Sequence, residues 1–279
     1  MKLLKRYAFV SALALVVLAG VIGAVVYSLR DPAEFTYKGK PLSEYLISMV
    51  PGHGNYDTDF QEAKAALIEA GTNAMPVLFR MLRAHDSALR LKLDTVGRKL
   101  GLIRKPFTPA SLKNQAAAAA FVILGSSRKD YVPELANVYE EQISVDSQLA
   151  VIQAIAGIGP PASGLGTPVI VKATIHTNLL VRRMAIHALR AVGVEPEIAV
   201  SALTNCVSDS DYCARYFADS LLSEYGSRAG AALPVLEDSL AHSGRSDQSP
   251  AARAIKKIDG PTYYRLVAEG KIIESPASQ

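Results

Sequence analysis

The sequence contains no tryptophan, and its aromatic residues amount to only 7% of 279 positions. This scarcity argues against platforms on which bases or sugars stack. Beyond residue 30 the sequence also has no excess of positive or negative charge. Of the 30 basic residues, four precede that point (Lys2, Lys5, Arg6 and Arg30), so 26 remain against 26 acidic ones. Because a domain that binds nucleic acid normally keeps a basic surplus, we expect no nucleic-acid partner.

Motifs for catalysis are absent as well. There is no HExxH pair, no Gly-x-x-x-x-Gly-Lys-Ser/Thr loop, no Gly-x-Gly-x-x-Gly and no nucleophile elbow. His53, between two glycines and close to Asp57 and Asp59, fits either a metal site or a flexible loop. We therefore predict a non-enzymatic protein without a cofactor, a bound metal or a small-molecule substrate.

The two cysteines, Cys206 and Cys213, are too few for a zinc site. Along one continuous helix they would stand about 10 Å apart, which is beyond disulfide reach. The residues between them are typical of a turn, so a helix that ends near Cys206 and another that begins near Asp211 would permit a bond. Two buried free thiols are the alternative.

One long hydrophobic run stands out. Tyr7 to Leu29 are 23 consecutive uncharged residues, and as a helix they would span about 34 Å, enough to cross a bilayer. Lys2, Lys5 and Arg6 precede the run, which predicts a cytoplasmic N-terminus and an exported remainder, periplasmic or at the cell surface. A cleaved signal peptide, and hence a secreted protein, is the competing interpretation, although such segments are usually shorter.

An internal repeat carries the fold prediction. Apolar helical segments end at glycines spaced 54, 34, 34, 33 and 34 residues apart, namely Gly71, Gly125, Gly159, Gly193, Gly226 and Gly260. Small residues recur eight and five positions before most of them, which indicates a closely packed helical face. Prolines within nine residues after each glycine favour the start of a second helix; they are Pro76, Pro133, Pro168, Pro196, Pro234 and Pro261. Pairs of this kind must stack to bury their apolar faces.

Two stretches resemble HEAT repeats, particularly the short type of phycobilisome lyase-like proteins. They run from Asn178 to Leu189 and from Asp211 to Ala218. The resemblance implies an all-α, right-handed α-α superhelix. It also implies a polar ladder between units that involves Arg182, Asp211 and Arg215. Other units carry Phe60, Asn114, Gln148 and Ser249 at the arginine position, so we expect the ladder only in the fourth and fifth units.

The segment from Tyr37 to Leu46 and the stretch after Asp86 are similar to those of exported, membrane-anchored bacterial HEAT-repeat proteins. The expected organisation is a single transmembrane helix at 1–30, a connecting segment at 31–59, repeats at 60–262 with an inserted helix and loop at 86–112, and a helix end with a polar tail at 263–279.

The insert carries the one uneven charge feature of the chain. Between residues 80 and 105, eight basic residues face two acidic ones. One interpretation is a solvated face on a helix over about 88–100, with Leu89, Leu93 and Val96 turned inward. The other is a docking patch for an acidic partner or anionic lipid, made of Arg90, Lys92, Arg98, Lys99, Arg104 and Lys105.

Together these features predict a membrane-anchored scaffold that binds one or more proteins through a broad curved surface. A chromophore-handling enzyme or chaperone similar to the phycobilisome lyases is one alternative. A purely structural role within a membrane complex is another.

Overall fold

The computed structural model describes residues 33–53, 56–101, 107–243 and 245–275. Within them the chain is helical, apart from a short hairpin and one isolated bridge between Ser246 and Ile273. The all-α prediction is confirmed. Contacts divide the chain after Phe35, and the fold described below belongs to the unit that begins at Thr36. The predicted membrane segment at 1–30, Arg104, Lys105 and the last four residues of the predicted tail lie outside the described residues.

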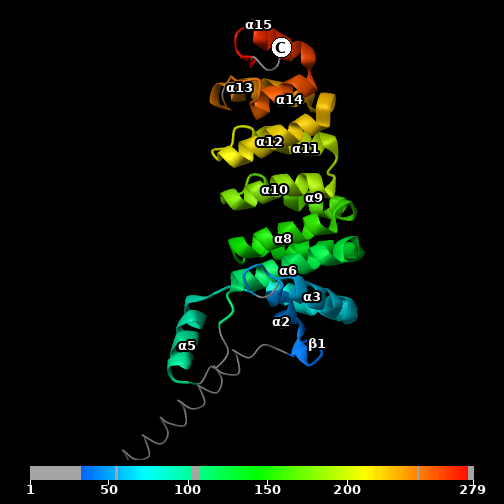
Figure 1. Cartoon of the computed structure of the whole chain (residues 1–279), viewed down its shortest axis with the longest axis vertical. Helices are drawn as coiled ribbons and strands as arrows, with labels where there is room; N and C mark the ends of the chain where they lie inside the picture. Colours follow the sequence, from blue (N-terminus) through cyan, green and yellow to red (C-terminus); the bar gives the residue numbers. More distant parts are fainter. Residues whose placement is uncertain (1–32, 54–55, 102–106, 244, 276–279) are drawn as a thin grey trace, which may run out of the picture. The chain divides into compact units, whose positions relative to one another are not determined.

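Helix pairs follow one another in sequence order in this unit (Figure 1). Short 3-10 turns join the helices of most pairs. The pairs are α3 (Tyr56–Ala70) with α4 (Ala74–Leu82), α6 (Ala110–Leu124) with α7 (Val132–Glu140), α8 (Val145–Ile158) with α9 (Ser163–Ala173), α10 (Leu179–Val192) with α11 (Pro196–Cys206), α12 (Tyr212–Tyr225) with α13 (Leu233–Ser243), and α14 (Pro250–Ile258) with α15 (Gly260–Ala268).

The turns explain the glycine period. Five of the six glycines, all except Gly260, have φ between 55° and 76°. Residues other than glycine rarely adopt this backbone conformation. Gly260 instead begins α15, because the side chain of Asp259 caps that helix by accepting a hydrogen bond from the backbone N–H of Thr262. Pro168 is a second exception. It lies inside α9, which begins five residues earlier, after the turn Pro160–Ala162.

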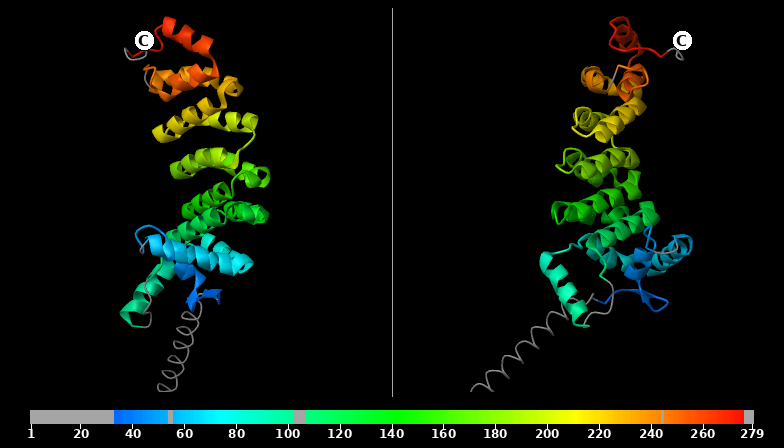
Figure 2. Two further views of the ribbon diagram at one scale, coloured as in Figure 1. Left: turned by 45° about the vertical axis from the view of Figure 1, so that its right-hand side comes forward. Right: turned by 60° about the vertical axis from the view of Figure 1, so that its left-hand side comes forward.

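The pairs are stacked in a row, as both views in Figure 2 show. The first helices α6, α8, α10, α12 and α14 pack each on the next, and each second helix packs on the first helix of the following pair. The repeated small residues lie in these contacts and are fully buried; they include Ala117, Ala185, Ala218 and Ala252. This packing is that of a helical solenoid.

One close approach shows why small residues are needed in the row. A β-carbon added to Gly157 of α8 would lie 2.7 Å from the Cα of Val122 in α6. The backbones of these two helices therefore approach at a point where no side chain fits between them.

Both ends of the row are covered. Strands β1 (Thr36–Tyr37) and β2 (Lys40–Pro41) form an antiparallel hairpin, and α2 (Leu42–Ser48) packs on α3 and α6. At the other end, Tyr263 and Leu266 are fully buried. The chain then folds back, and the N–H of Ile273 donates to the carbonyl of Arg245 at 2.7 Å. Much of the predicted polar tail thus belongs to the packed structure.

Candidate functional site

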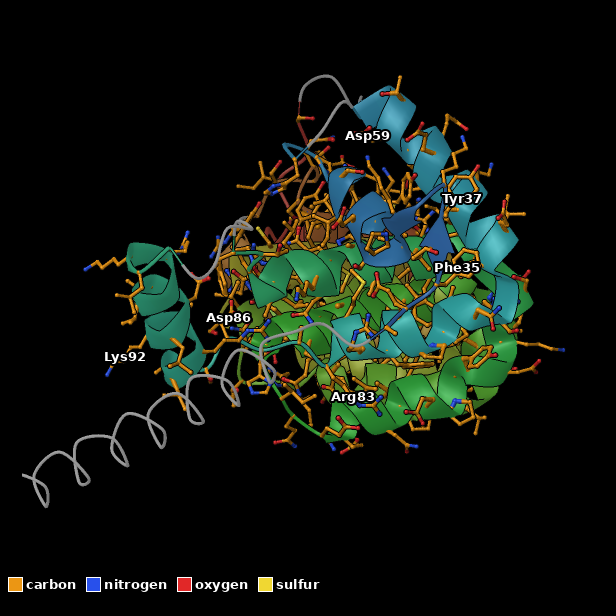
Figure 3. All side chains as sticks on the ribbon, turned by 90° about the horizontal axis from the view of Figure 1, so that it is seen from below. Phe35, Tyr37, Asp59, Arg83, Asp86 and Lys92 are labelled. Atoms are coloured by element: carbon orange, nitrogen blue, oxygen red, sulfur yellow. The ribbon has the colours of Figure 1, made fainter. Side chains whose placement is uncertain are left out.

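Four of the six residues of the predicted basic patch lie on α5 (Ala88–Lys99), which Ser87 caps by accepting a hydrogen bond from the N–H of Arg90. Lys92, Arg98 and Lys99 are exposed, and Arg90 is half-buried. Arg98 forms an ion pair of 2.5 Å with Asp94. In Figure 3, α5 stands apart from the stacked helices, with Lys92 on its outer side.

The interpretation in which Leu89, Leu93 and Val96 all turn inward is wrong, because only Leu93 among them is half-buried. Leu89 is 67% exposed and Val96 52%, and Leu100, just after the helix, is 65% exposed. The reason is that α5 leaves the row, so none of the stacked helices presents a face to this apolar stripe in the described part of the chain. The exposed stripe and the basic residues form one amphipathic surface.

The predicted polar ladder is present, with different partners. The guanidinium of Arg182 donates from Nε and Nη2 to the two carboxylate oxygens of Asp209, at 2.6 and 2.7 Å. Asp211 instead accepts two hydrogen bonds from Arg183, at 2.6 and 2.5 Å. Arg215 donates to the carbonyls of Asp209 and Ser210, at 2.6 and 3.1 Å.

These arginines act on the turns that precede their own helices. Arg182 also donates to the carbonyls of His176 and Thr177, six and five residues earlier, and Arg215 repeats this pattern 33 residues later. Burial raises the pKa of Asp209, but the hydrogen bonds from Arg182 and from the backbone N–H of Asp211, together with the charge of Arg182, hold that pKa below its ordinary value. The hydrogen bonds from Arg183 lower the pKa of Asp211 to about 2. Both carboxylates of the ladder are thus paired with an arginine, which suits a structural role.

The expectation that polar links between units occur only in the fourth and fifth units is wrong. Asn114 in α6 is fully buried, and its Nδ2 donates to the carbonyls of Met81 and Leu82 at 2.8 and 2.9 Å. Ser147 in α8 donates to the same Leu82 carbonyl at 2.7 Å. These two side chains satisfy the carbonyl of Leu82 at the end of α4, whereas the Met81 carbonyl also accepts from the backbone N–H of Ala84. In the sequence, this link was indicated only by the polar side chain of Asn114 at the position that is equivalent to Arg182 and Arg215.

A third polar contact between units connects the residues on either side of the insert. Arg83, at the end of α4, donates to both carboxylate oxygens of Glu141 at 2.9 Å and to Glu134 at 2.6 Å. These hydrogen bonds raise the pKa of Arg83 and lower that of Glu141. Part of the local basic surplus is therefore neutralised by the second unit, and the residues of α5 carry most of what is left.

Cys206 and Cys213 are both free thiols. Helix α11 ends at Cys206 and α12 begins at Tyr212, so the break that a disulfide needs is present. Cys206 is nevertheless only 2% exposed and contacts the carbonyls of Ala202 and Thr174. Burial raises the pKa of its thiol to about 11, so the reactive thiolate is scarce at neutral pH.

A groove opens between α9 and α11, two consecutive second helices. Its volume is about 400 Å³. Ile175 and Ile198 on its walls are 69% and 45% exposed. Along α11, Glu197, Ser201 and Asn205 are exposed at intervals of four residues, so they form one polar edge. The lining residues are Val171, Thr174, Ile175, Glu197, Ile198, Ser201, Ala202 and Asn205.

No group of His, Cys, Asp or Glu within the described residues is arranged to hold a metal ion. In the same part of the chain no single helix is long and apolar enough to span a bilayer. One pair, Val145–Ile158 with Pro160–Thr174, meets the length and composition criteria together but is bent by 117°.

No family model matches the chain, and no curated protein is significantly similar to it. Among solved structures, a crystal structure described as an engineered protein of the Northeast Structural Genomics Consortium aligns with 84% of this chain and 98% of its own. The two are 17% identical, and the TM-score is 0.42. A likeness at this level carries no argument about function.

Proposed function

We propose that this protein is a HEAT-like scaffold, a right-handed α-α superhelix held at a bacterial membrane by residues 7–29, whose exported part binds a protein partner and catalyses no reaction. The observation that carries the binding part is the groove between α9 and α11. It combines exposed apolar side chains with a row of exposed polar ones.

The groove suits an extended segment of another protein. Ile175 and Ile198 offer apolar surface on which a hydrophobic side chain of the partner would lose contact with water. Ser201 and Asn205 carry donors and acceptors that reach the backbone groups of a bound segment. Sites that combine apolar anchors with a few polar groups are typical of recognition surfaces.

The stacked row supports the same interpretation. Each second helix packs on the next unit, so the groove lies between α11 on one side and α9, with the turn that follows it, on the other. Repeat arrays generally bind partners through such extended surfaces. The step from this architecture to a scaffold is by analogy with other solenoids.

The test compares partner recovery by the wild type and the double variant I175D/I198D after crosslinking in cells. We expect the double variant to recover at least about ten-fold less of any specific partner, because two carboxylates in the groove would have to be desolvated on binding. The matched control is Ile68→Asp on α3. Ile68 is 67% exposed and lies far from the groove in sequence and in the row.

Equal recovery by the groove variant and the control would refute the proposal that this groove binds the partner. Circular dichroism of both variants checks that the helices are intact. Both isoleucines are exposed, so we expect the melting temperatures of the variants to stay close to that of the wild type.

A further inference from the structure

The surface of α5 carries the features of a helix that lies in a membrane interface. Leu89, Leu93, Val96 and Leu100 follow one another at intervals of four, three and four residues and therefore share one face. Three of them are more than half exposed. A stripe of this kind is costly in water and needs a cover.

Basic residues border this stripe. By helical periodicity, Lys92 and Lys99 lie along one side of it and Arg90 along the other. The only acidic residue of α5, Asp94, is occupied by its ion pair with Arg98. An apolar face flanked by lysine and arginine is the pattern of helices that lie flat on a membrane with anionic lipids.

The insert that contains α5 also begins and ends close to the N-terminal end of the row. The carboxylate of Asp86 accepts a hydrogen bond of 2.9 Å from the N–H of Ala110. This bond joins the two ends of the insert at its base. That base connects α4 with α6, and both helices contact α2. Helix α5 therefore extends from the same end of the row as the N-terminal hairpin (Figure 1).

Chain length then limits how far this end can be from a bilayer. Only the six residues 30–35 separate the predicted span from Thr36, and fully extended they reach about 20–25 Å. With residues 7–29 in the membrane, Thr36 would stay within this distance of the end of the span. A bilayer is thus the one apolar and anionic partner that the chain itself brings close to α5.

We propose that α5 is an interfacial helix that lies on the exported surface of the membrane, with its leucine stripe among the acyl chains and its basic residues at anionic headgroups. This inference rests on the membrane anchor of the proposed function. It adds a second contact, which would fix how the row and its groove are oriented over the membrane.

The absence of tryptophan gives a direct test. The full chain with the substitution Val96→Trp, reconstituted into vesicles of phosphatidylethanolamine and phosphatidylglycerol, carries one tryptophan on the stripe. Interfacial helices bury their apolar face about 5–10 Å into the bilayer, so brominated acyl chains should remove roughly half of its fluorescence. The matched control is Tyr264→Trp, which is 61% exposed on α15 at the opposite end of the row and should not be quenched.

Two further variants sharpen the result. In the V96W background, L89S with L100S should abolish quenching, and vesicles of phosphatidylcholine alone should weaken it. No quenching of V96W in protein that floats with the vesicles would overturn the inference while leaving the anchor in place. The same follows if V96W emission shifts to the blue without quenching, because a second protein copy would then cover the stripe. Protein that does not float at all would refute the anchor and the inference together.

Discussion

Asp219 offers a quantitative test of the packing. It lies in the first helix α12, is 1% exposed, and its Oδ1 has no hydrogen-bond partner. The equivalent positions of the three preceding units are Ala118, Ile152 and Ile186, all in the core. Burial raises the pKa of the Asp219 carboxyl to about 7, although the charge of Arg215 opposes the shift. A carboxyl group thus stands where the repeat calls for an apolar side chain.

This shift makes the free energy of unfolding depend on pH. Between the unfolded pKa of 3.8 and the folded pKa of about 7, the folded state keeps a proton that the unfolded state has lost. The stabilising contribution of the protonated group is complete below pH 3.8 and is lost as the pH rises towards 7. At about 1.4 kcal/mol for each pKa unit, the loss reaches about 4 kcal/mol above pH 7, a large part of a typical domain's stability.

The assay is urea unfolding followed by circular dichroism at pH 5 and pH 8. Between these values we expect the wild type to lose about 3 kcal/mol relative to Asp219→Asn, because the amide cannot ionise. The control is Asp130→Asn, since Asp130 is exposed in the turn before α7; this variant should follow the wild type. If Asp219→Asn and the wild type show the same pH dependence, the carboxyl is not buried as described and the reasoning is refuted.

Two other predictions concern the row and its thiols. Gly157→Ala should cost about 1–3 kcal/mol of unfolding free energy, because the new β-carbon would press on Val122. Gly164→Ala, which meets no atom within 4 Å, should be neutral or stabilise by up to about 1 kcal/mol; a Gly157→Ala protein as stable as this control would contradict the close helix contact. Under native conditions an alkylating reagent should label Cys213 and spare Cys206 until the protein is unfolded. A disulfide found by mass spectrometry of unreduced protein would disprove the free-thiol description.

The sequence pattern predicted the helix pairs because their cause is local. A glycine with positive φ ends a helix, and small residues one turn apart allow close packing, so both recur with the period of the unit. Gly260 and Pro168 depart from the pattern for equally local reasons: an aspartate cap at Asp259 in the first case and an earlier proline turn in the second.

The partners of the polar residues could not be predicted, because they depend on how neighbouring turns face one another. Arg182 and Arg183 are adjacent in sequence, yet they bind Asp209 and Asp211 respectively. The role of Asn114 depends on which carbonyls the end of α4 presents 30 or more residues earlier.

The surface of α5 and the groove between α9 and α11 could not be predicted from the periodicity of the sequence either. The pattern of α5 identifies an amphipathic helix but not whether its stripe meets protein or solvent. The groove brings Ile175 and Ile198 together from two different units, and only their placement in space shows that both remain exposed.

The central claim is that the row binds a protein partner through the face between α9 and α11. It is tested most directly by placing a photo-crosslinking amino acid at position 198 in cells, with position 68 on α3 as the control site. We predict a discrete adduct from position 198 that disappears when Ile175→Asp is added, and none from position 68. Identical adduct patterns from both sites, or none from either, would contradict the claim.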